Sequence, residues 1–257
     1  MCDIRRITLL PVSLLVFLSV LVFSVSPVSA QVAFSTDEAR FISTNPNLAF
    51  QDFLGTFVAP DDLLLCLAPA NSASDDDCFS PGQILPGIEF TIKPRRPERV
   101  ELIVVGSDFD GNNNPTNPLI ANQFPSGLDI LFTAPDINAV GITAGCLLEG
   151  DPCTPRNMVV SVYGENGLLG STVIMVSDSF DTFLGINTKK PIVEILLEQE
   201  DESPILTFQE GVLNVRFGTR EFTGIPTLSE WGMIAAAAGL GLIGLFAVRR
   251  RMVRADS

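Results

Sequence analysis

Short segments rich in β-branched and aromatic residues recur along the middle of the chain, and Gly, Pro, Asn or Asp residues bound each of them. No internal segment places apolar residues at a sustained helical spacing. Leu128, Ile130 and Phe132 instead take alternate positions with Asp129 and Thr133 nearby, which is typical of a half-buried antiparallel strand. About ten short strands at such spacing predict an all-β fold, an antiparallel β-sandwich of two packed sheets. The expected strands are 88–92, 100–105, 128–133, 139–143, 158–163, 169–176, 182–186, 192–197, 205–208 and 212–217.

A tight turn is predicted where Gly164, Glu165, Asn166 and Gly167 separate two of these segments. Two-residue hairpin loops need residues that tolerate positive φ angles, and glycine adopts them without steric cost. We therefore expect a β-hairpin here, with its glycines supplying the positive φ angles.

The first 30 residues have the composition of an export signal. Arg5 and Arg6 precede an apolar run over 7–25, and the small residues Val28, Ser29 and Ala30 follow it. A signal peptidase reads small residues at such a boundary, so we expect the general secretion machinery to export the chain and cleavage to leave Gln31 first. The alternative is an uncleaved anchor helix, because the apolar run is long for a signal.

The last 33 residues, 225–257, form a second hydrophobic end segment. An apolar stretch runs from 231 to 248, and as a helix it spans about 27 Å, enough for the core of a bilayer. Trp231 lies at its outer boundary, where amphipathic rings prefer to be, and Arg249, Arg250 and Arg251 follow its inner end. This arrangement predicts a C-terminal transmembrane helix that holds the body, residues 31–224, outside the cytoplasm.

This ending closely resembles the IPTL-CTERM sorting signal of bacterial surface proteins. The family pattern is Ile-Pro-Thr-Leu, two variable residues, Trp-Gly, a membrane helix and an Arg-rich end. The resemblance implies recognition by an exosortase-type membrane transpeptidase, which would cut near the motif and pass the body to an acceptor at the cell surface. An ordinary single-pass anchor is the alternative. The matching motif residues are Ile225, Pro226, Thr227, Leu228, Trp231 and Gly232.

Three strings of the body, 128–140, 161–170 and 183–192, look like parts of the jelly-roll ectodomains that are common in sorted surface proteins. That fold resembles carbohydrate-binding modules and other lectin-like sandwiches. The resemblance rests on residues of the core and the turns, so it implies a fold and transfers no binding residue.

The charge of the body excludes several classes of function. Residues 31–224 carry 27 acidic and 10 basic side chains, a field that repels nucleic-acid backbones. The chain has no histidine, so a Ser-His-Asp or Cys-His enzyme is ruled out and the commonest zinc ligand is missing. Carboxylate chemistry and oxygen-ligand metal sites remain open.

Four cysteines remain in an exported body once the signal is removed, and they allow three pairings. We expect structural disulfides between nearest neighbours, Cys66 with Cys78 and Cys146 with Cys153. A loop of about 13 residues closed in this way contributes roughly 3 kcal/mol in the chain-entropy model. A thiolate metal site is the weaker alternative, because histidine and two-residue cysteine spacing are both missing.

An acidic loop invites a calcium interpretation, because Asp108, Asp110, Asn112 and Asn114 place oxygen atoms at alternate positions. The loop fails as an EF-hand, which requires Gly at the sixth position and Glu at the twelfth. We favour a polar turn between two strands, since Asp and Asn tolerate positive φ angles. The acidic run 75–77 is a weaker calcium candidate, because it lies in a Ser-rich loop that we expect a disulfide at Cys78 to close. The acidic run 198–202 is expected to be a solvated loop after a strand.

These observations favour a non-catalytic structural or adhesion role at the cell surface or in an extracellular matrix. Sugar sites usually present aromatic platforms, but Trp231 lies outside the body and Tyr163 is its one tyrosine. The 18 phenylalanines are expected to lie in the core. The alternatives are a calcium-assisted carbohydrate-binding module that takes a surface glycan and, less favoured, a glycoside hydrolase with paired carboxylates.

Overall fold

The computed structural model describes residues 31–94, 101–122, 126–148, 151–200 and 208–220, together with Ala235, Ala237 and Leu240. The chain divides into two units, Met1–Arg220 and Glu221–Ser257. All described strands lie in the first unit, which we call the body.

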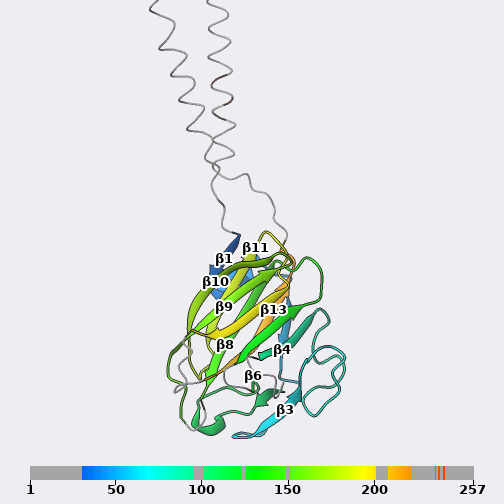
Figure 1. Ribbon diagram of the computed structural model, residues 1–257, viewed down its shortest axis with the longest axis vertical. Coiled ribbons are helices and arrows are strands. Elements are labelled where there is room, and N and C mark those ends of the chain that lie inside the picture. The colour runs from blue at the N-terminus through cyan, green and yellow to red at the C-terminus, as the bar shows by residue number, and fades with distance from the viewer. Residues whose placement is uncertain are drawn as a thin grey trace, which may run out of the picture. The chain divides into compact units, whose positions relative to one another are not determined.

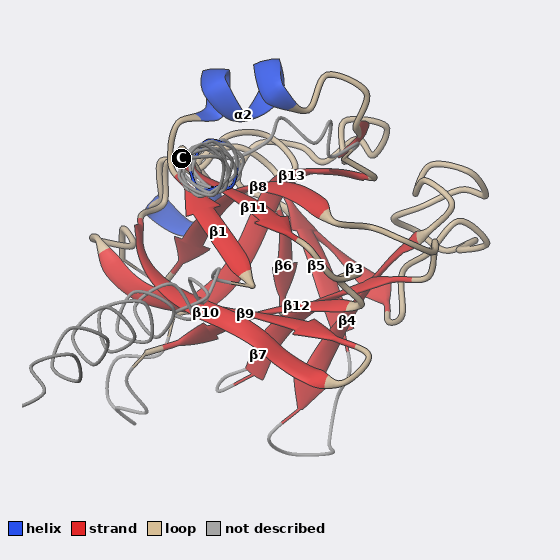
Figure 2. Cartoon of the chain, turned by 90° about the horizontal axis from the view of Figure 1, so that it is seen from above, coloured by secondary structure: helices blue, strands red, loops and turns tan. Residues whose placement is uncertain are grey.

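Two antiparallel sheets form the body, and they face each other as layers (Figures 1 and 2). The large sheet has the order β1 (Val32–Ser35), β11 (Thr182–Thr188), β8 (Ala139–Leu147), β13 (Gln209–Gly218), β6 (Leu119–Ala121), β5 (Glu101–Val105) and β3 (Leu63–Leu67), and β2 (Ala49–Asp52) also pairs with β13. The small sheet has the order β10 (Gly167–Val176), β9 (Arg156–Gly164), β12 (Glu194–Gln199), β7 (Ser126–Phe132) and β4 (Ile88–Pro94). The predicted antiparallel β-sandwich is confirmed.

The strands from β6 to β13 follow the order of a jelly roll. In the large sheet they run β11, β8, β13, β6, and in the small sheet they run β10, β9, β12, β7. From β6 to β13 the chain therefore crosses between the sheets at every connection except the hairpin that joins β9 and β10 within the small sheet. Strands β1, β3, β4 and β5 extend this eight-stranded framework beyond its edge strands, and β2 pairs with the inner strand β13.

Nine of the ten expected strands coincide with observed strands, while the tenth, 205–208, lies mostly outside the described residues. Four observed strands, β1, β2, β3 and β6, were not expected, and neither was the helix α2 (Glu38–Thr44). Helix α2 has only seven residues, too few to show a periodic pattern. Its start is nevertheless well defined, because the carboxylate of Asp37 accepts a hydrogen bond from the Arg40 backbone N–H.

The hairpin between β9 and β10 forms at the predicted turn, but only one of its glycines has a positive φ. Gly167 has a φ of 104°, whereas Gly164 keeps ordinary strand backbone. Gly164 is required for space instead, because a Cβ atom there would lie 2.9 Å from the carbonyl oxygen of Pro191. The turn was therefore predicted correctly and the role of Gly164 was not.

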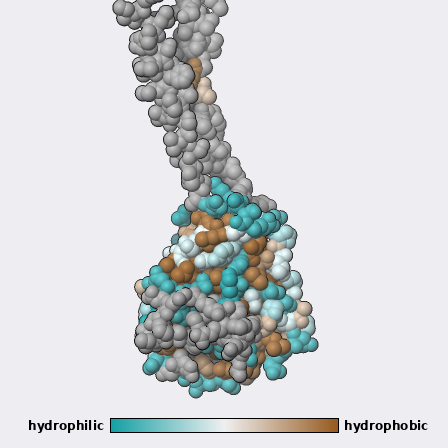
Figure 3. All heavy atoms as spheres, viewed as in Figure 1, coloured by the Kyte–Doolittle hydropathy of each residue, from teal (hydrophilic) through white to brown (hydrophobic). Residues whose placement is uncertain are grey.

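Apolar side chains from the inner faces of both sheets fill the space between them. Phe132 of the small sheet contacts Phe217 of the large sheet, with ring centroids 5.8 Å apart. Most described phenylalanines are buried, as expected, but Phe57 is 87% exposed. Figure 3 shows that apolar side chains also reach the surface of the body, in small groups among polar residues.

Candidate functional site

Two disulfides brace loops of the body, and both have the predicted pairing. Cys66 is bonded to Cys78 with the Cα atoms 5.4 Å apart, and Cys146 is bonded to Cys153 with the Cα atoms 6.0 Å apart. Both bonds are buried, and each closes a short loop at the end of a strand of the large sheet. Paired cysteines in a small domain are typical of exported proteins, because the cytosol keeps thiols reduced.

Within the loop closed by Cys66 and Cys78, the carboxylate of the half-buried Asp76 bonds nearby backbone groups. It accepts hydrogen bonds from the backbone N–H groups of Cys78, Phe79 and Leu67. Charge-assisted hydrogen bonds of this kind are stronger than neutral ones. Asp76 therefore organises this loop, which the Cys66–Cys78 disulfide closes as expected.

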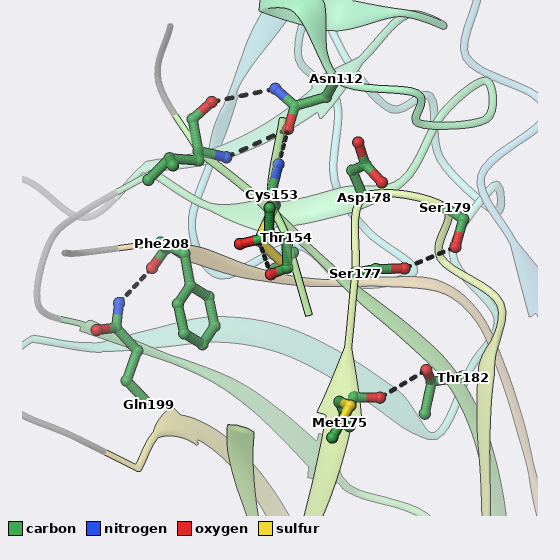
Figure 4. The surroundings of a disulfide bond; sticks show 12 residues. Asn112, Cys153, Thr154, Met175, Ser177, Asp178, Ser179, Thr182, Gln199 and Phe208 are labelled. Atoms are coloured by element: carbon green, nitrogen blue, oxygen red, sulfur yellow. Dashed lines mark hydrogen bonds between the residues drawn. A yellow bond between two sulfur atoms is a disulfide. The ribbon is translucent and has the colours of Figure 1, made fainter. Parts of the chain in front are cut away.

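Three loops meet around the second disulfide (Figure 4). The side-chain oxygen of Asn112 accepts the Cys153 backbone N–H at 3.0 Å, and its amide nitrogen donates to the Leu148 carbonyl at 3.0 Å. The carboxylate of Asp178, from the loop between β10 and β11, accepts the Asn113 backbone N–H at 3.0 Å. These bonds connect segments that lie up to 65 residues apart in the sequence.

The loop proposed for calcium uses its amide side chains for structure. Asn114 accepts the Phe109 backbone N–H at 2.8 Å and donates to the Gly106 carbonyl, and both Asn112 and Asn114 are almost completely buried. Asp108 and Asp110 have positive φ angles of 58° and 49°. Among the described residues, no group of three or more His, Cys, Asp or Glu side chains is arranged to hold a metal ion. Asn112 and Asn114 thus have a structural role, as a polar turn requires, and calcium binding stays an untested alternative.

A cluster of charged residues on the outer face of the small sheet was not expected from the sequence. Asp129 of β7 alternates with the core residues Leu128 and Ile130, so its side chain lies on the outer face of the sheet, yet it is only 8% exposed. One of its carboxylate oxygens, Oδ1, is buried and has no hydrogen-bond partner among the residues that the structure describes. An unpaired buried carboxylate is costly, so this position is energetically unusual.

Neighbouring strands supply the charges around Asp129. Lys93 of β4 forms an ion pair with Glu194 of β12 at 3.0 Å, and its ammonium lies 5.4 Å from the centre of the Tyr163 ring on β9. Burial raises the pKa of the Asp129 carboxyl to about 7, and the negative charge of Glu194 adds to this effect while Lys93 opposes it. The hydrogen bond to Glu194 raises the pKa of Lys93. The pattern of apolar residues in β7 predicts a half-buried strand and carries no information about these partners.

Residues 221–257 lie outside the described part of the chain apart from the three helical positions Ala235, Ala237 and Leu240. The sorting-motif residues and the arginine cluster therefore have no structural account, and the predicted signal segment 1–30 also lies outside. Of the helices that the structure describes, none combines the length and the apolar character needed to cross a membrane.

Comparison with known proteins identifies the tail. The family model of the IPTL-CTERM motif matches residues 223–251. The chain carries an IPTL-CTERM motif. Such a motif is a C-terminal sorting signal of exported proteins. It indicates that this chain is an exported, surface-associated protein. No curated protein and no solved structure matches the chain.

Proposed function

We propose that this protein is a cell-surface or extracellular-matrix protein. Its C-terminal sorting signal directs the body to the outside of the cell. A signal peptidase removes residues 1–30, the apolar segment 233–248 holds the chain in the membrane, and an exosortase-type transpeptidase cuts near 225–232. The observation that carries this proposal is the IPTL-CTERM motif over 223–251, at the end of a chain whose body is stapled by two disulfides.

We infer that the body has a structural or adhesion role and catalyses no reaction. Two features support this inference. The polar side chains of the loops around the second disulfide are used to hold those loops together, as Asn112, Asn114 and Asp178 show. Glu194, beside the unusual Asp129, is engaged by Lys93. A rigid sandwich with internally bonded loops suits a protein that must persist outside the cell.

Carbohydrate binding is the second candidate function. The jelly-roll order of β6 to β13 favours it, as does the outer face of the small sheet, where Tyr163 lies beside Lys93 and Glu194. A glycan array probed with the full-length protein, with and without calcium, tests this role. Binding that Tyr163→Ala abolishes would support it over a purely structural role.

Separate parts of the tail should control membrane retention and processing. Deleting residues 233–251 removes the apolar segment, so the body should be released. Replacing Pro226, Thr227 and Trp231 with Ala preserves most of the hydrophobicity and the arginine cluster, so insertion should persist in the same orientation. If a transpeptidase reads the motif, this triple variant should accumulate as an uncut, membrane-bound precursor.

Gel analysis and fractionation of the variants in the native host provide the test. Ser229→Ala is the matched control, because it changes a variable position of the family pattern within the same segment. The control should be processed like the parent. Equal mass and equal membrane fraction for the triple variant and the parent would remove the sorting proposal and leave an ordinary single-pass anchor.

A further inference from the structure

Strand β10 forms an unprotected edge of the small sheet. It pairs with β9, lies at the end of the strand order, and in its ten residues carries neither a charge nor a proline. Edge strands present unpaired backbone N–H and C=O groups, and soluble proteins commonly protect them with charges, prolines or short lengths. Strand β10 lacks all three forms of protection.

The edge at β3, by contrast, is protected by carboxylates. Asp62 accepts the Leu63 backbone N–H at 2.8 Å, and Asp76 accepts the Leu67 backbone N–H at 3.0 Å. Both bonds occupy backbone groups that a further strand would need, and they place negative charge along the edge.

The other two outer strands are also protected. Ala70 bridges to Phe90 of β4 through two backbone hydrogen bonds, of 2.8 and 2.9 Å, which cover the middle of that edge. Strand β1 has only four residues. Among the strands at the ends of the two described sheets, β10 is therefore the long edge that is left open.

The geometry of the hairpin shows which residues of β10 face this edge. Its two-residue turn makes Gly164 and Gly167 a hydrogen-bonded pair, and the register then shifts by one residue between Leu168 and Gly170. Hydrogen-bonded and non-hydrogen-bonded pairs alternate from there along the antiparallel ladder. The residues whose backbone groups point away from β9 are Ser171, Val173 and Met175.

An independent contact supports this assignment. The Met175 carbonyl accepts a hydrogen bond from the Thr182 hydroxyl at 2.9 Å, so this carbonyl points away from β9. The side chains of these edge residues are also accessible, since Val173 is 47% and Met175 is 63% exposed. The Met175 carbonyl has a second lone pair left for a partner strand, and the edge also offers the backbone groups of Ser171 and Val173 and an apolar surface.

We propose that β10 pairs with β10 of a second copy of this chain, antiparallel and about a two-fold axis at Val173. The two small sheets then become one continuous sheet across two bodies. In this register Val173 of one copy faces Val173 of the other, and Ser171 faces Met175. The pairing is closed, because it uses the same edge of both copies and leaves no further β10 edge free.

Charge restricts where two copies of this chain can meet, and the uncharged β10 is a segment where their repulsion is smallest. The chain has a net charge of −14, so two copies repel each other over most of their surface, whereas β10 is an uncharged strand of ten residues. A short strand pairing buries less than the roughly 1,000 Å² that a stable interface needs. The contact therefore depends on the proposed display of many copies on one surface, which raises their effective concentration.

Cysteine cross-linking of the full-length protein in its native host tests the pairing. Val173→Cys should give a disulfide-linked dimer on a non-reducing gel, because hydrogen-bonded antiparallel partners have Cα atoms about 5.5 Å apart, within disulfide range. Val159→Cys is the matched control, since Val159 lies directly opposite Val173 on β9 but one strand away from the edge. Equal cross-linking of the two variants, or none in Val173→Cys, would overturn the proposal.

A second pair of variants separates the edge from the face of the sheet. In the Val173→Cys background, Met175→Lys places a charge on the paired edge and should lower cross-linking about fivefold or more. Val159→Lys places the same charge on the same face and should leave cross-linking unchanged. Thiol labelling that finds both native disulfides intact shows that each variant is folded. An equal loss in both variants would assign the contact to the face and refute edge pairing.

Cross-linking is scored separately in processed protein and in uncut precursor, because both carry β10. A failure of the sorting test would therefore leave the cross-linking result interpretable.

Discussion

Asp129 occupies a position where ionisation is costly, because its carboxyl is buried on the outer face of the small sheet among other acidic side chains. Glu194 and Glu198 of β12 and Glu89 of β4 raise its pKa, and Lys93 of β4 opposes them, with burial as the largest cause. The folded protein therefore holds a proton at Asp129 up to a pH of about 7, whereas an unfolded chain releases it near 3.8.

The stability of the body should fall as the pH rises through this interval. Below about pH 4 the carboxyl is protonated in both the folded and the unfolded state, and between the two pKa values the folded state binds more protons, so raising the pH favours unfolding. We expect the free energy of unfolding to fall by about 2 kcal/mol over this pH interval. This is less than the full pKa difference implies, because solvent partly screens the charge.

Asp129→Asn, which mimics the neutral form, should remove most of this loss. Thermal melts from pH 4 to 8 should give similar melting temperatures for the variant and the parent at pH 4, and a variant about 4–8 °C higher at pH 8. Asp136→Asn is the control, since Asp136 is an exposed carboxylate outside the cluster. An Asp129→Asn variant whose melting temperature follows that of the parent from pH 4 to 8 would contradict the raised pKa of Asp129. So would a parent protein that Asp129 makes more stable between pH 5 and 8.

At the scale of elements, helix α2 is attached to the large sheet through glycines. Phe41 of α2 is buried against Gly141 of β8 and Gly185 of β11, and its ring lies 5.5 Å from that of Phe183. A Cβ atom at Gly185 would lie 2.4 Å from the Phe41 ring, so the glycine provides the space that the helix occupies.

Gly185→Ala should therefore destabilise the body by about 1–3 kcal/mol, because the added methyl group forces Phe41 and its helix away from the sheet. Phe41→Leu should destabilise it as well, through lost packing. The two changes combined should cost clearly less than their sum, because the smaller side chain makes room for the methyl group. Denaturant unfolding of the single and double variants measures this coupling, and simple additivity would show that Phe41 is not the obstacle.

The loop from Asp108 to Asn114 should respond only weakly to calcium, because Asn112 and Asn114 use their side-chain amides to bond the backbone. We expect 1 mM calcium to stabilise the protein by less than about 1 kcal/mol. A site with a dissociation constant near 0.1 mM would give about 1.4 kcal/mol at that concentration. Melting curves with calcium, and with magnesium as the control, decide the matter, and a calcium-specific shift of the larger size would establish a real site.

At the scale of the whole molecule, the acidic body and its disulfides are consistent with life outside the cytoplasm. The net charge of −14 favours solubility and disfavours association with other acidic surfaces. Both disulfides close short loops and constrain the unfolded chain, which suits a protein that has no access to cytosolic chaperones.

Mature protein recovered from the cell surface should begin at Gln31, because Val28, Ser29 and Ala30 form the boundary that a signal peptidase reads. Mass spectrometry of the N-terminal peptide tests this directly. Ala30→Arg should block cleavage and leave the apolar run attached, whereas Gln31→Asn should be cleaved normally. Surface material with an intact Met1 would show that the first segment is an anchor and not a signal.

The sequence by itself determined the features that are written in local patterns. Alternating apolar residues with Gly, Pro, Asn and Asp at the turns correctly predicted nine of the observed strands, because side-chain alternation and turn chemistry are local properties. The disulfide pairing followed from short separations between cysteines, and the tail was recognisable because its motif is contiguous.

Only the tertiary structure decided the features that depend on contacts between distant segments. Strands β1, β2 and β6 have three or four residues, so they are stabilised by their neighbours in the sheet and not by their own pattern. Asn112 became a structural residue through its bond to Cys153, 41 residues away in the sequence. The raised pKa of Asp129 likewise arises from burial and from charges on β4 and β12, which the local sequence around Asp129 does not contain.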